Sequence, residues 1–142
     1  MKFKKNIYAI ANAKARMRMS ILYFFANMHN ALVVGTSNKS EIVLGYATKY
    51  GDGASDIIPI GDLWKTQVME LAEHLGIPQK ILNKAPTAEL VSGVTDESEL
   101  GADYEILDRI LRLHFEQGAS HDEIISSGFD RELVRNVFER IK

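Results

Sequence analysis

The sequence has 142 residues, about one domain of chain, with 46% hydrophobic and 25% charged residues, as is ordinary for a soluble globular protein. It contains no cysteine, which excludes a disulfide framework and a thiolate metal site. No apolar run approaches the roughly 20 residues that span a bilayer, so no membrane segment is expected.

The net charge of -2 is distributed unevenly along the chain. Residues 1–40 contain seven lysines and arginines and no acidic residue, whereas the remainder contains 10 basic and 19 acidic residues. A basic start of this kind can belong to a nucleic-acid arm, a transit peptide, an anion site or an exposed helix face. A secretory signal is not expected, because Asn12, Lys14 and Arg16 interrupt any apolar segment there.

The first part of the chain predicts a long helix followed by a short strand. Residues 6–29 form the expected helix, entered afresh at Asn12 if that residue caps it, with apolar side chains at spacings of three and four. After Ser20 the apolar arc widens, which indicates burial on more than one side by a partner or by further chain. Residues 32–35 predict a strand buried on both faces, and residues 57–60 a second short strand or an extended link.

Helical signals dominate the rest of the chain. We expect helices at 39–50, at 63–75 behind Gly61 and Asp62, at 78–83, at 102–117, at 121–126, and from a cap at Asp130 to the end. Residues 84–100 predict a long polar loop, which in a compact domain is usually functional or disordered. One or two strands make a poor sheet, so either the fold is mainly helical with a vestigial sheet or further strands lie outside this sequence.

Three features around the expected strand suggest a phosphate site. The turn Gly35-Thr36-Ser37-Asn38 can place backbone N–H groups and a hydroxyl against a phosphate, although it also fits a simple capped turn. Glu41, in the first helical turn, suits the helix dipole and could also hold Mg²⁺ beside a phosphate. Lys65, in the first turn of its helix, opposes the usual dipole preference, which favours an anionic ligand there.

A glycine-rich loop carries Lys49, Asp52 and Asp56. Glycine permits close approach of the backbone to a ligand, and these side chains can bind hydroxyls, amines or phosphates; an exposed loop with ordinary charges fits equally well. The four histidines are far apart in the sequence and predict no metal cluster. Residues 92–96 resemble half a phosphate loop, but they follow no predicted strand and open no apolar helix, so we assign them no role.

Six short segments then occur in a specific order. They are NAKARMRM at 12–19, VGTSNKSE at 34–41, TKYGDG at 48–53, PIGDLWKT at 59–66, APTAEL at 85–90 and TDESELG at 95–101. Together they resemble the ammonia-dependent NAD synthetases over roughly residues 6–142. Each segment alone is unspecific, whereas the ordered set is specific.

The resemblance implies an α/β fold of the Rossmann-like ATP-pyrophosphatase type, here mostly helical with one or two short parallel strands, in a cytoplasmic homodimer. In that family ATP and Mg²⁺ adenylate the nicotinate carboxylate of deamido-NAD, pyrophosphate leaves, and ammonia attacks the acyl-adenylate to give NAD and AMP. A carboxylate resists amination until its oxygen becomes a good leaving group, so the site has to neutralise phosphate charge and exclude water. No nucleic-acid or membrane partner is implied.

The resemblance also implies roles at individual positions for ATP and its metal. Thr36, Lys65 and Thr87 are expected to contact ATP, and Glu41 to ligate Mg²⁺. The 84–100 loop is expected to be a mobile cover over the reacting centre.

The second substrate has its own implied residues. Arg16, Lys49 and Asp56 are expected to bind deamido-NAD, with Arg16 near the dimer interface. Asp52 lies in the same loop and is assigned the catalytic position.

Two departures from the family pattern qualify this reading. The Ser-Gly-Gly-x-Asp-Ser loop that grips pyrophosphate and the later His-Lys pair are both absent from the sequence. Residues 1–142 therefore resemble one partial domain, the middle and C-terminal portion of a synthetase, and we expect little or no turnover from this chain alone. The alternative is a non-catalytic helical dimerisation module with its basic helix as the partner face.

Overall fold

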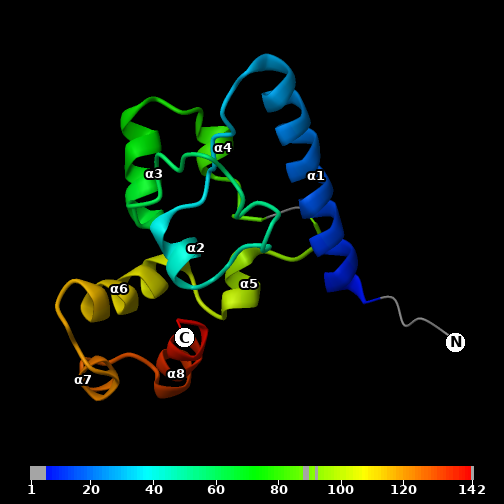
Figure 1. Ribbon diagram of the computed structural model, residues 1–142. Coiled ribbons are helices and arrows are strands. Elements are labelled where there is room, and N and C mark those ends of the chain that lie inside the picture. Colours follow the sequence, from blue (N-terminus) through cyan, green and yellow to red (C-terminus); the bar gives the residue numbers. More distant parts are fainter. Residues whose placement is uncertain (1–5, 88–89, 92, 142) are drawn as a thin grey trace, which may run out of the picture.

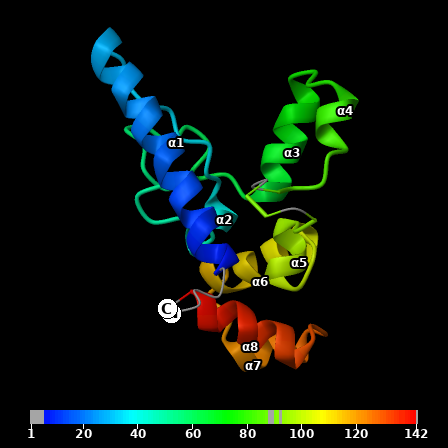
Figure 2. The same ribbon diagram turned by 90° about the vertical axis from the view of Figure 1, so that its right-hand side faces the viewer.

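The computed structural model describes residues 6–87, 90–91 and 93–141. Those residues form eight helices: α1 (Ile7–His29), α2 (Lys39–Val43), α3 (Lys65–His74), α4 (Gln79–Leu82), α5 (Asp96–Leu100), α6 (Tyr104–Phe115), α7 (His121–Ser126) and α8 (Arg131–Arg140). Figures 1 and 2 show α1 as a long rod that stands apart from the α3–α4 pair, while α6, α7 and α8 pack together at the other end of the molecule. Within the described ranges, no helix is long and apolar enough to cross a membrane.

Helix α1 begins earlier than a cap at Asn12 would allow. The side chain of Asn6 accepts a hydrogen bond from the backbone N–H of Ala9 and so caps the helix itself. Asn12 instead lies inside the helix, where its Oδ1 accepts a hydrogen bond from the Thr48 hydroxyl at 2.9 Å. The helix ends at Asn30, whose φ of 51° is left-handed.

The apolar stripe of α1 faces outward. The buried residues of this helix are small: Ala11, Ala15 and Ala26. The large side chains at spacings of three and four are exposed, Ile21 by 55% and Phe24 by 60%. The wide apolar arc read from the sequence is therefore uncovered in the single described chain.

The two expected strands are reduced to one contact. Val34 and Ile57 form an isolated parallel bridge, in which Gly35 N–H donates to the Ile57 carbonyl at 2.7 Å and Asp56 N–H to the Val33 carbonyl at 2.9 Å. No strand is assigned in the described residues, so the expected strands are not confirmed. The expectation that residues 32–35 are buried on both faces is wrong, because Val33 is buried while Leu32 and Val34 are exposed.

Helix boundaries differ from the sequence expectations where a local turn intervenes. Helix α2 has only five residues, because Gly45 adopts a left-handed φ of 62° soon after it. Helix α5 lies inside the expected 84–100 loop, where the hydroxyl of Thr95 accepts from Ser98 N–H and the Ser98 hydroxyl accepts from Thr95 N–H. Helix α7 agrees with expectation, and α8 starts as expected, since Asp130 caps it by accepting from Leu133 N–H, but it ends at Arg140 and does not continue to the last residue.

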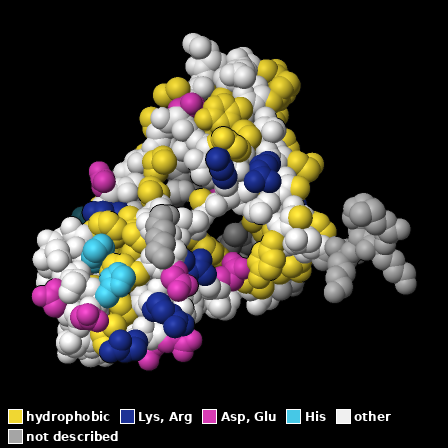
Figure 3. Space-filling model, turned by 60° about the horizontal axis from the view of Figure 1, so that its bottom comes forward, with side chains coloured by type: hydrophobic (Ala, Val, Ile, Leu, Met, Phe, Trp, Pro, Cys, Tyr) yellow, Lys and Arg dark blue, Asp and Glu magenta, His cyan; other side chains and the backbone are white. Residues whose placement is uncertain are grey.

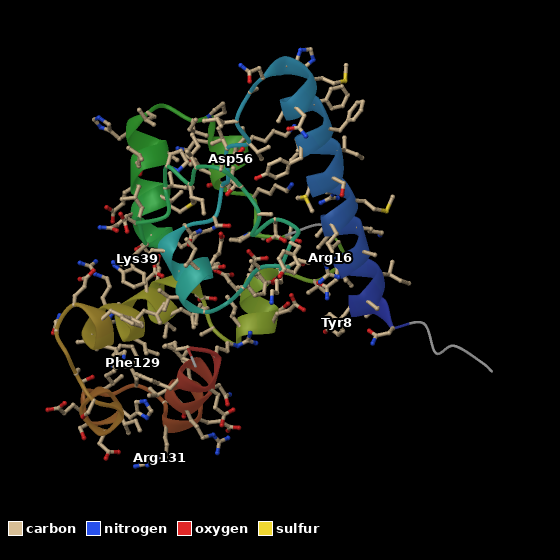
Figure 4. All side chains as sticks on the ribbon, viewed as in Figure 1. Tyr8, Arg16, Lys39, Asp56, Phe129 and Arg131 are labelled. Atoms are coloured by element: carbon tan, nitrogen blue, oxygen red, sulfur yellow. The ribbon has the colours of Figure 1, made fainter. Side chains whose placement is uncertain are left out.

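The core lies around α6, which contacts α2, α3 and α7. Its members are the buried residues Leu44, Trp64, Leu100, Tyr104, Leu107, Ile110, Leu111, Ile124, Val134, Val137 and Phe138. In Figure 4 Phe129 lies on the connection between α7 and α8, and its ring packs under the Arg109 guanidinium at 5.2 Å. Figure 3 shows the end of the molecule seen from below, where charged side chains of both signs are mixed on the lower left. The α6–α8 end is thus an amphipathic helical layer on which α2 and α3 rest.

Candidate functional site

A cleft of about 530 Å³ opens between α1, the turn after Val34, the starts of α2 and α3, and the segment that precedes α5. Its lining includes five of the residues singled out in the sequence: Thr36, Glu41, Asp52, Lys65 and Thr87. These side chains come from four separate stretches of chain. The fold therefore brings together the residues predicted to meet ATP, together with the predicted metal ligand and the predicted catalytic aspartate.

Lys65 and Glu41 form an ion pair at the base of the cleft. The Nζ of Lys65 lies 3.2 Å from Oε1 of Glu41, and both side chains are less than one-fifth exposed. The Lys65 Nζ also lies 5.2 Å from the centre of the Tyr104 ring. The lysine at the start of α3 is therefore held by a carboxylate and an aromatic face.

Glu41 is fixed by the cap of its own helix. Its second carboxylate oxygen accepts from the backbone N–H of Asn38 at 3.1 Å, while the Asn38 side chain accepts from Glu41 N–H. This reciprocal capping box starts α2, and Asn38 is 1% exposed. The simple capped-turn reading of the 35–38 segment is thus correct, and it coexists with a position at the edge of the cleft.

Thr36, Thr87 and Asp52 surround the same space. Thr36 is exposed, whereas the hydroxyl of Thr87 donates to the carbonyl of Val94 at 2.9 Å and ties the two sides of the 84–100 segment together. Asp52 accepts from Thr48 N–H at 3.0 Å, which closes the glycine-rich loop on itself. The Thr36 hydroxyl and the Asp52 carboxylate thus belong to side chains that line the cleft.

The three residues assigned to deamido-NAD lie beside the cleft and outside its lining. Arg16 donates from Nε to the carbonyl of Lys49 at 3.1 Å, which links α1 to the glycine-rich loop. The Lys49 ammonium lies 5.1 Å from the centre of the adjacent Tyr50 ring. Figure 4 labels Arg16 on α1 and Asp56 on the connection between α2 and α3. Their roles toward a ligand remain predictions.

Asp56 makes structural contacts in this chain. Its Oδ2 accepts from the backbone N–H of Val33 at 2.7 Å, and its Oδ1 accepts from the Tyr23 hydroxyl at 3.2 Å. The Asp56 carboxylate thereby joins α1 to the segment that forms the parallel bridge. A binding role for Asp56 would have to be added to this structural one.

Sequence reasoning missed several lining residues, of which Arg18, Lys84 and Asp96 are charged. Arg18 lies two residues beyond Arg16 on α1, so it points in another direction, and that direction is into the cleft. Asp96 lies in the segment to which we assigned no role, and it is 6% exposed. The signal that could have found it is the Thr95–Ser98 cap, which places Asp96 at the start of a helix.

Asp96 has an unusual electrostatic environment. Burial raises the pKa of its carboxyl group, and the Lys65 charge and a hydrogen bond from Tyr46 oppose that shift only in part. The Tyr46 hydroxyl lies 3.2 Å from Asp96 and 2.6 Å from Glu99, and burial together with these carboxylates raises the pKa of Tyr46. Asp96 is therefore a carboxyl group that holds its proton more tightly than a surface aspartate does.

The residues in the cleft fit a magnesium–nucleotide complex. Mg²⁺ takes oxygen ligands and is commonly bound through one or two carboxylates together with substrate phosphates. Glu41 and Asp96 line the same cleft and lie close enough for the charge of Glu41 to raise the pKa of Asp96. The described residues contain no group of three or more histidine, cysteine, aspartate or glutamate side chains that could hold a metal by themselves. A metal here would accordingly arrive with phosphate oxygens.

The family model described as NAD synthase matches residues 1–142 of this chain. The NH(3)-dependent NAD(+) synthetase of Saccharolobus solfataricus is 50% identical to it over 139 residues, which cover 97% of this chain and 50% of that protein. The enzyme of the same name from Methanocaldococcus jannaschii is 53% identical over 135 residues, 94% of this chain and 52% of the relative. The chain therefore spans about half the length of the curated relatives it matches.

Solved structures resemble the fold as well. A structure described as NMN synthetase from Francisella tularensis matches with a TM-score of 0.75 and 39% identity, over 96% of this chain and 50% of that one. The NH3-dependent NAD synthetase from Campylobacter jejuni, in complex with the nitrate ion, matches with a TM-score of 0.73 and 31% identity, over 99% and 52%. The arrangement described above is thus similar to that of the matched half of these two structures.

Proposed function

We propose that this chain, which belongs to the NAD synthase family, supplies the nucleotide-binding cleft for the ATP-dependent amidation of deamido-NAD by ammonia. The observation that carries the proposal is that Thr36, Glu41 and Lys65 line one cleft together with Thr87. The resemblance assigned all four to ATP and its metal. Family membership favours this enzymatic role over a non-catalytic dimerisation module.

The proposed reaction has two steps. First, an oxygen of the nicotinate carboxylate attacks the α-phosphorus of ATP, the bond to pyrophosphate breaks, and an acyl-adenylate forms. Second, ammonia attacks the acyl carbon, AMP leaves with the electrons of the broken C–O bond, and a proton is lost to give the amide of NAD. Mg²⁺ would supply charge neutralisation of the phosphates in the first step.

Lys65 is the residue best placed to hold a phosphate. Its ammonium group is at the cleft base and less than one-fifth exposed, so its charge is screened less than that of a surface lysine. Arg18 adds a second positive charge to the lining. Glu41 would bind the magnesium ion of the nucleotide, and the Asn38 cap keeps its carboxylate in place.

The deamido-NAD residues extend the proposal to the neighbouring loop. Arg16, Lys49 and Asp56 would hold the dinucleotide beside the cleft, and Asp52, which lines the cleft, would act on the reacting centre. Asp52 could accept the proton that ammonia loses, because a carboxylate at the cleft wall is a suitable general base. The hydrogen bond from Arg16 to the Lys49 carbonyl would keep this loop beside α1.

We further propose that the working form is a cytoplasmic homodimer, as the resemblance implied. The exposed apolar side chains of α1 support this, since Ile21, Phe24 and Phe25 are each more than half exposed. Ile21→Asp should shift the sedimentation coefficient to that of a monomer, whereas Leu75→Asp, a control at an exposed apolar position outside α1, should leave it unchanged. Identical sedimentation of wild type and Ile21→Asp would exclude α1 as the dimer interface.

Calorimetric titration with MgATP tests the central proposal. We expect heat of binding for the wild type and a much weaker but still measurable affinity in Lys65→Ala. Lys39→Ala is the matched control, because Lys39 is also near the start of a helix but lies 4.5 Å over the Trp64 ring and does not line the cleft. Folded wild-type protein that gives no heat at millimolar MgATP would overturn the assignment of this cleft.

A further inference from the structure

Helix α3 starts without a side-chain cap from its own N-cap residue. That residue is Trp64, whose indole has no acceptor for the free amides of the first turn. The amides of Lys65 and Thr66 are instead satisfied from two other helices. Lys65 N–H donates to the Ser40 hydroxyl at 2.8 Å, and Thr66 N–H donates to Oδ2 of Asp108 at 2.8 Å.

The two acceptors are themselves joined. The Ser40 hydroxyl donates to Oδ1 of Asp108 at 2.5 Å, so one carboxylate on α6 receives hydrogen bonds from α2 and from the start of α3. Ser40 is fully buried and Asp108 is 1% exposed. A buried carboxylate is costly unless its oxygens are hydrogen-bonded, and here each oxygen has a partner.

These hydrogen bonds hold two residues of the cleft although they lie outside its lining. Ser40 is the residue before Glu41, and the amides bound by Ser40 and Asp108 belong to Lys65 and its neighbour. The same three hydrogen bonds therefore fix both ends of the Lys65–Glu41 pair, although neither Ser40 nor Asp108 lines the cleft.

We propose that Asp108 is a positioning residue for the nucleotide site, acting through Ser40 and the first turn of α3 to hold Lys65 against Glu41. The proposal rests on the function proposed above, because it assumes that Lys65 binds a phosphate of ATP. It adds a residue of the helical layer, 42 positions from Thr66, to the machinery of the cleft.

The test compares three substitutions in the full chain. Asp108→Asn keeps the side-chain volume but turns one acceptor oxygen into a donor, which faces another donor. We expect MgATP affinity to fall about tenfold, since small displacements of a binding group have large effects. Ser40→Ala, which removes the intermediate hydroxyl, should give the same loss. Asp130→Asn is the control, because Asp130 also accepts a hydrogen bond from a backbone amide at a helix start, but that helix is α8.

A double substitution separates positioning from mere loss of structure. If Asp108 acts through Lys65, then Asp108→Asn in a Lys65→Ala background should cause no further loss of MgATP affinity. The proposal would be overturned if the double variant lost the product of the two single losses of MgATP affinity. It would also be overturned if Asp130→Asn lost as much affinity as Asp108→Asn. If circular dichroism shows that Asp108→Asn is unfolded, Ser40→Ala takes its place, alone and in the Lys65→Ala background.

A measurement without nucleotide keeps this proposal distinct from the proposed function. The amides of Lys65 and Thr66 should exchange with deuterium faster in Asp108→Asn than in the wild type, while the amide of Leu133 should not change. Unchanged exchange at Thr66 would show that Asp108 does not hold the start of α3, and it would overturn the proposal whatever the protein binds. Wild-type protein with the expected exchange but no affinity for MgATP would instead overturn the proposed function.

Discussion

The ammonium nitrogen of Lys65 lies 3.2 Å from the carboxylate of Glu41, across 24 positions of sequence, and the two side chains are 19% and 18% exposed. A phosphate bound to Lys65 would take the place of Glu41 in this pair, and a cation bound to Glu41 would take the place of Lys65. The two charges thus neutralise each other within the cleft, and a magnesium nucleotide could exchange with this pair without leaving a bare charge.

Glu41→Gln should remove the effect of Mg²⁺ on ATP binding. The neutral amide retains a carbonyl oxygen that can accept from Asn38 N–H, so α2 should still be capped. The wild type should bind ATP more tightly with Mg²⁺ than with a chelator, and the variant should bind equally in both. The check is calorimetric titration under both conditions, and a variant with the full wild-type response to Mg²⁺ would rule out Glu41 as the ligand.

Asp56→Ala should destabilise the chain by about 1–3 kcal/mol, because the part-buried N–H of Val33 loses its acceptor. Tyr23→Phe removes the exposed hydrogen bond to the same carboxylate and should cost at most about 1 kcal/mol. Urea denaturation of the three proteins gives the comparison. Equal stability of wild type and Asp56→Ala would contradict the structural role and leave ligand binding as the reason for this residue.

Gly35→Ala should be strongly unfavourable at the turn before Thr36. An added Cβ would collide with the Ser55 hydroxyl and lie 2.8 Å from the Ser55 Cβ, so the bridge between residues 34 and 57 has to open. Overpacking of this kind costs about 1–3 kcal/mol. Gly53→Ala is the control, since its Cβ would have no contact shorter than 3.5 Å, and it should change the stability by less than about 1 kcal/mol. Thermal unfolding of both variants is the measurement.

Asp96→Asn should stabilise the chain at neutral pH relative to the wild type. Burial raises the pKa of Asp96 above its ordinary value of 3.8, so between these two pKa values the folded state retains a proton that the unfolded state has lost. The wild-type free energy of unfolding then falls as the pH rises through this window and levels off above the folded pKa.

The charged groups around Asp96 determine how the pH series is interpreted. Lys65 opposes the shift, Glu41 and Glu99 add to it, and Tyr46 donates a hydrogen bond that an asparagine oxygen could also accept. The stability difference between Asp96→Asn and wild type should grow with pH across the acidic window and then stay constant. Urea denaturation from acidic to neutral pH measures it, and a difference that is independent of pH would show that ionisation of Asp96 is not its cause.

Local signals in the sequence predicted the helices well where caps and periodicity agreed. Helix α7 has a capping box between Ser120 and Glu123 as well as an apolar face, and its bounds matched expectation. Helix α2 was expected to continue to residue 50, since nothing in the sequence shows that Gly45 adopts a left-handed φ. The expected strand failed because a strand is defined by its neighbours, and Val34 has one bridge partner in the described chain.

The cleft residues could be predicted only where a segment resembled a known family. Thr36, Glu41, Lys65 and Thr87 stood in such segments, and the structure brings them together. Asp96 also stood in such a segment, but nothing in it showed that this carboxyl group is buried in the cleft. Asp108 gave no local signal, since its contacts are with residues more than 40 positions away. Long-range hydrogen bonds of this kind follow from packing, which a single sequence does not display.

Trp64 has a practical consequence for studies of this protein. It is the only tryptophan of the sequence, it is 1% exposed, and its indole N–H donates to Glu116 at 2.6 Å just before Lys65. Because Trp64 directly precedes Lys65, we expect its emission spectrum to respond to changes at the start of α3 without any dye or label. Stopped-flow fluorescence could follow nucleotide binding in real time. The same signal could also follow unfolding of the helical layer formed by α6, α7 and α8.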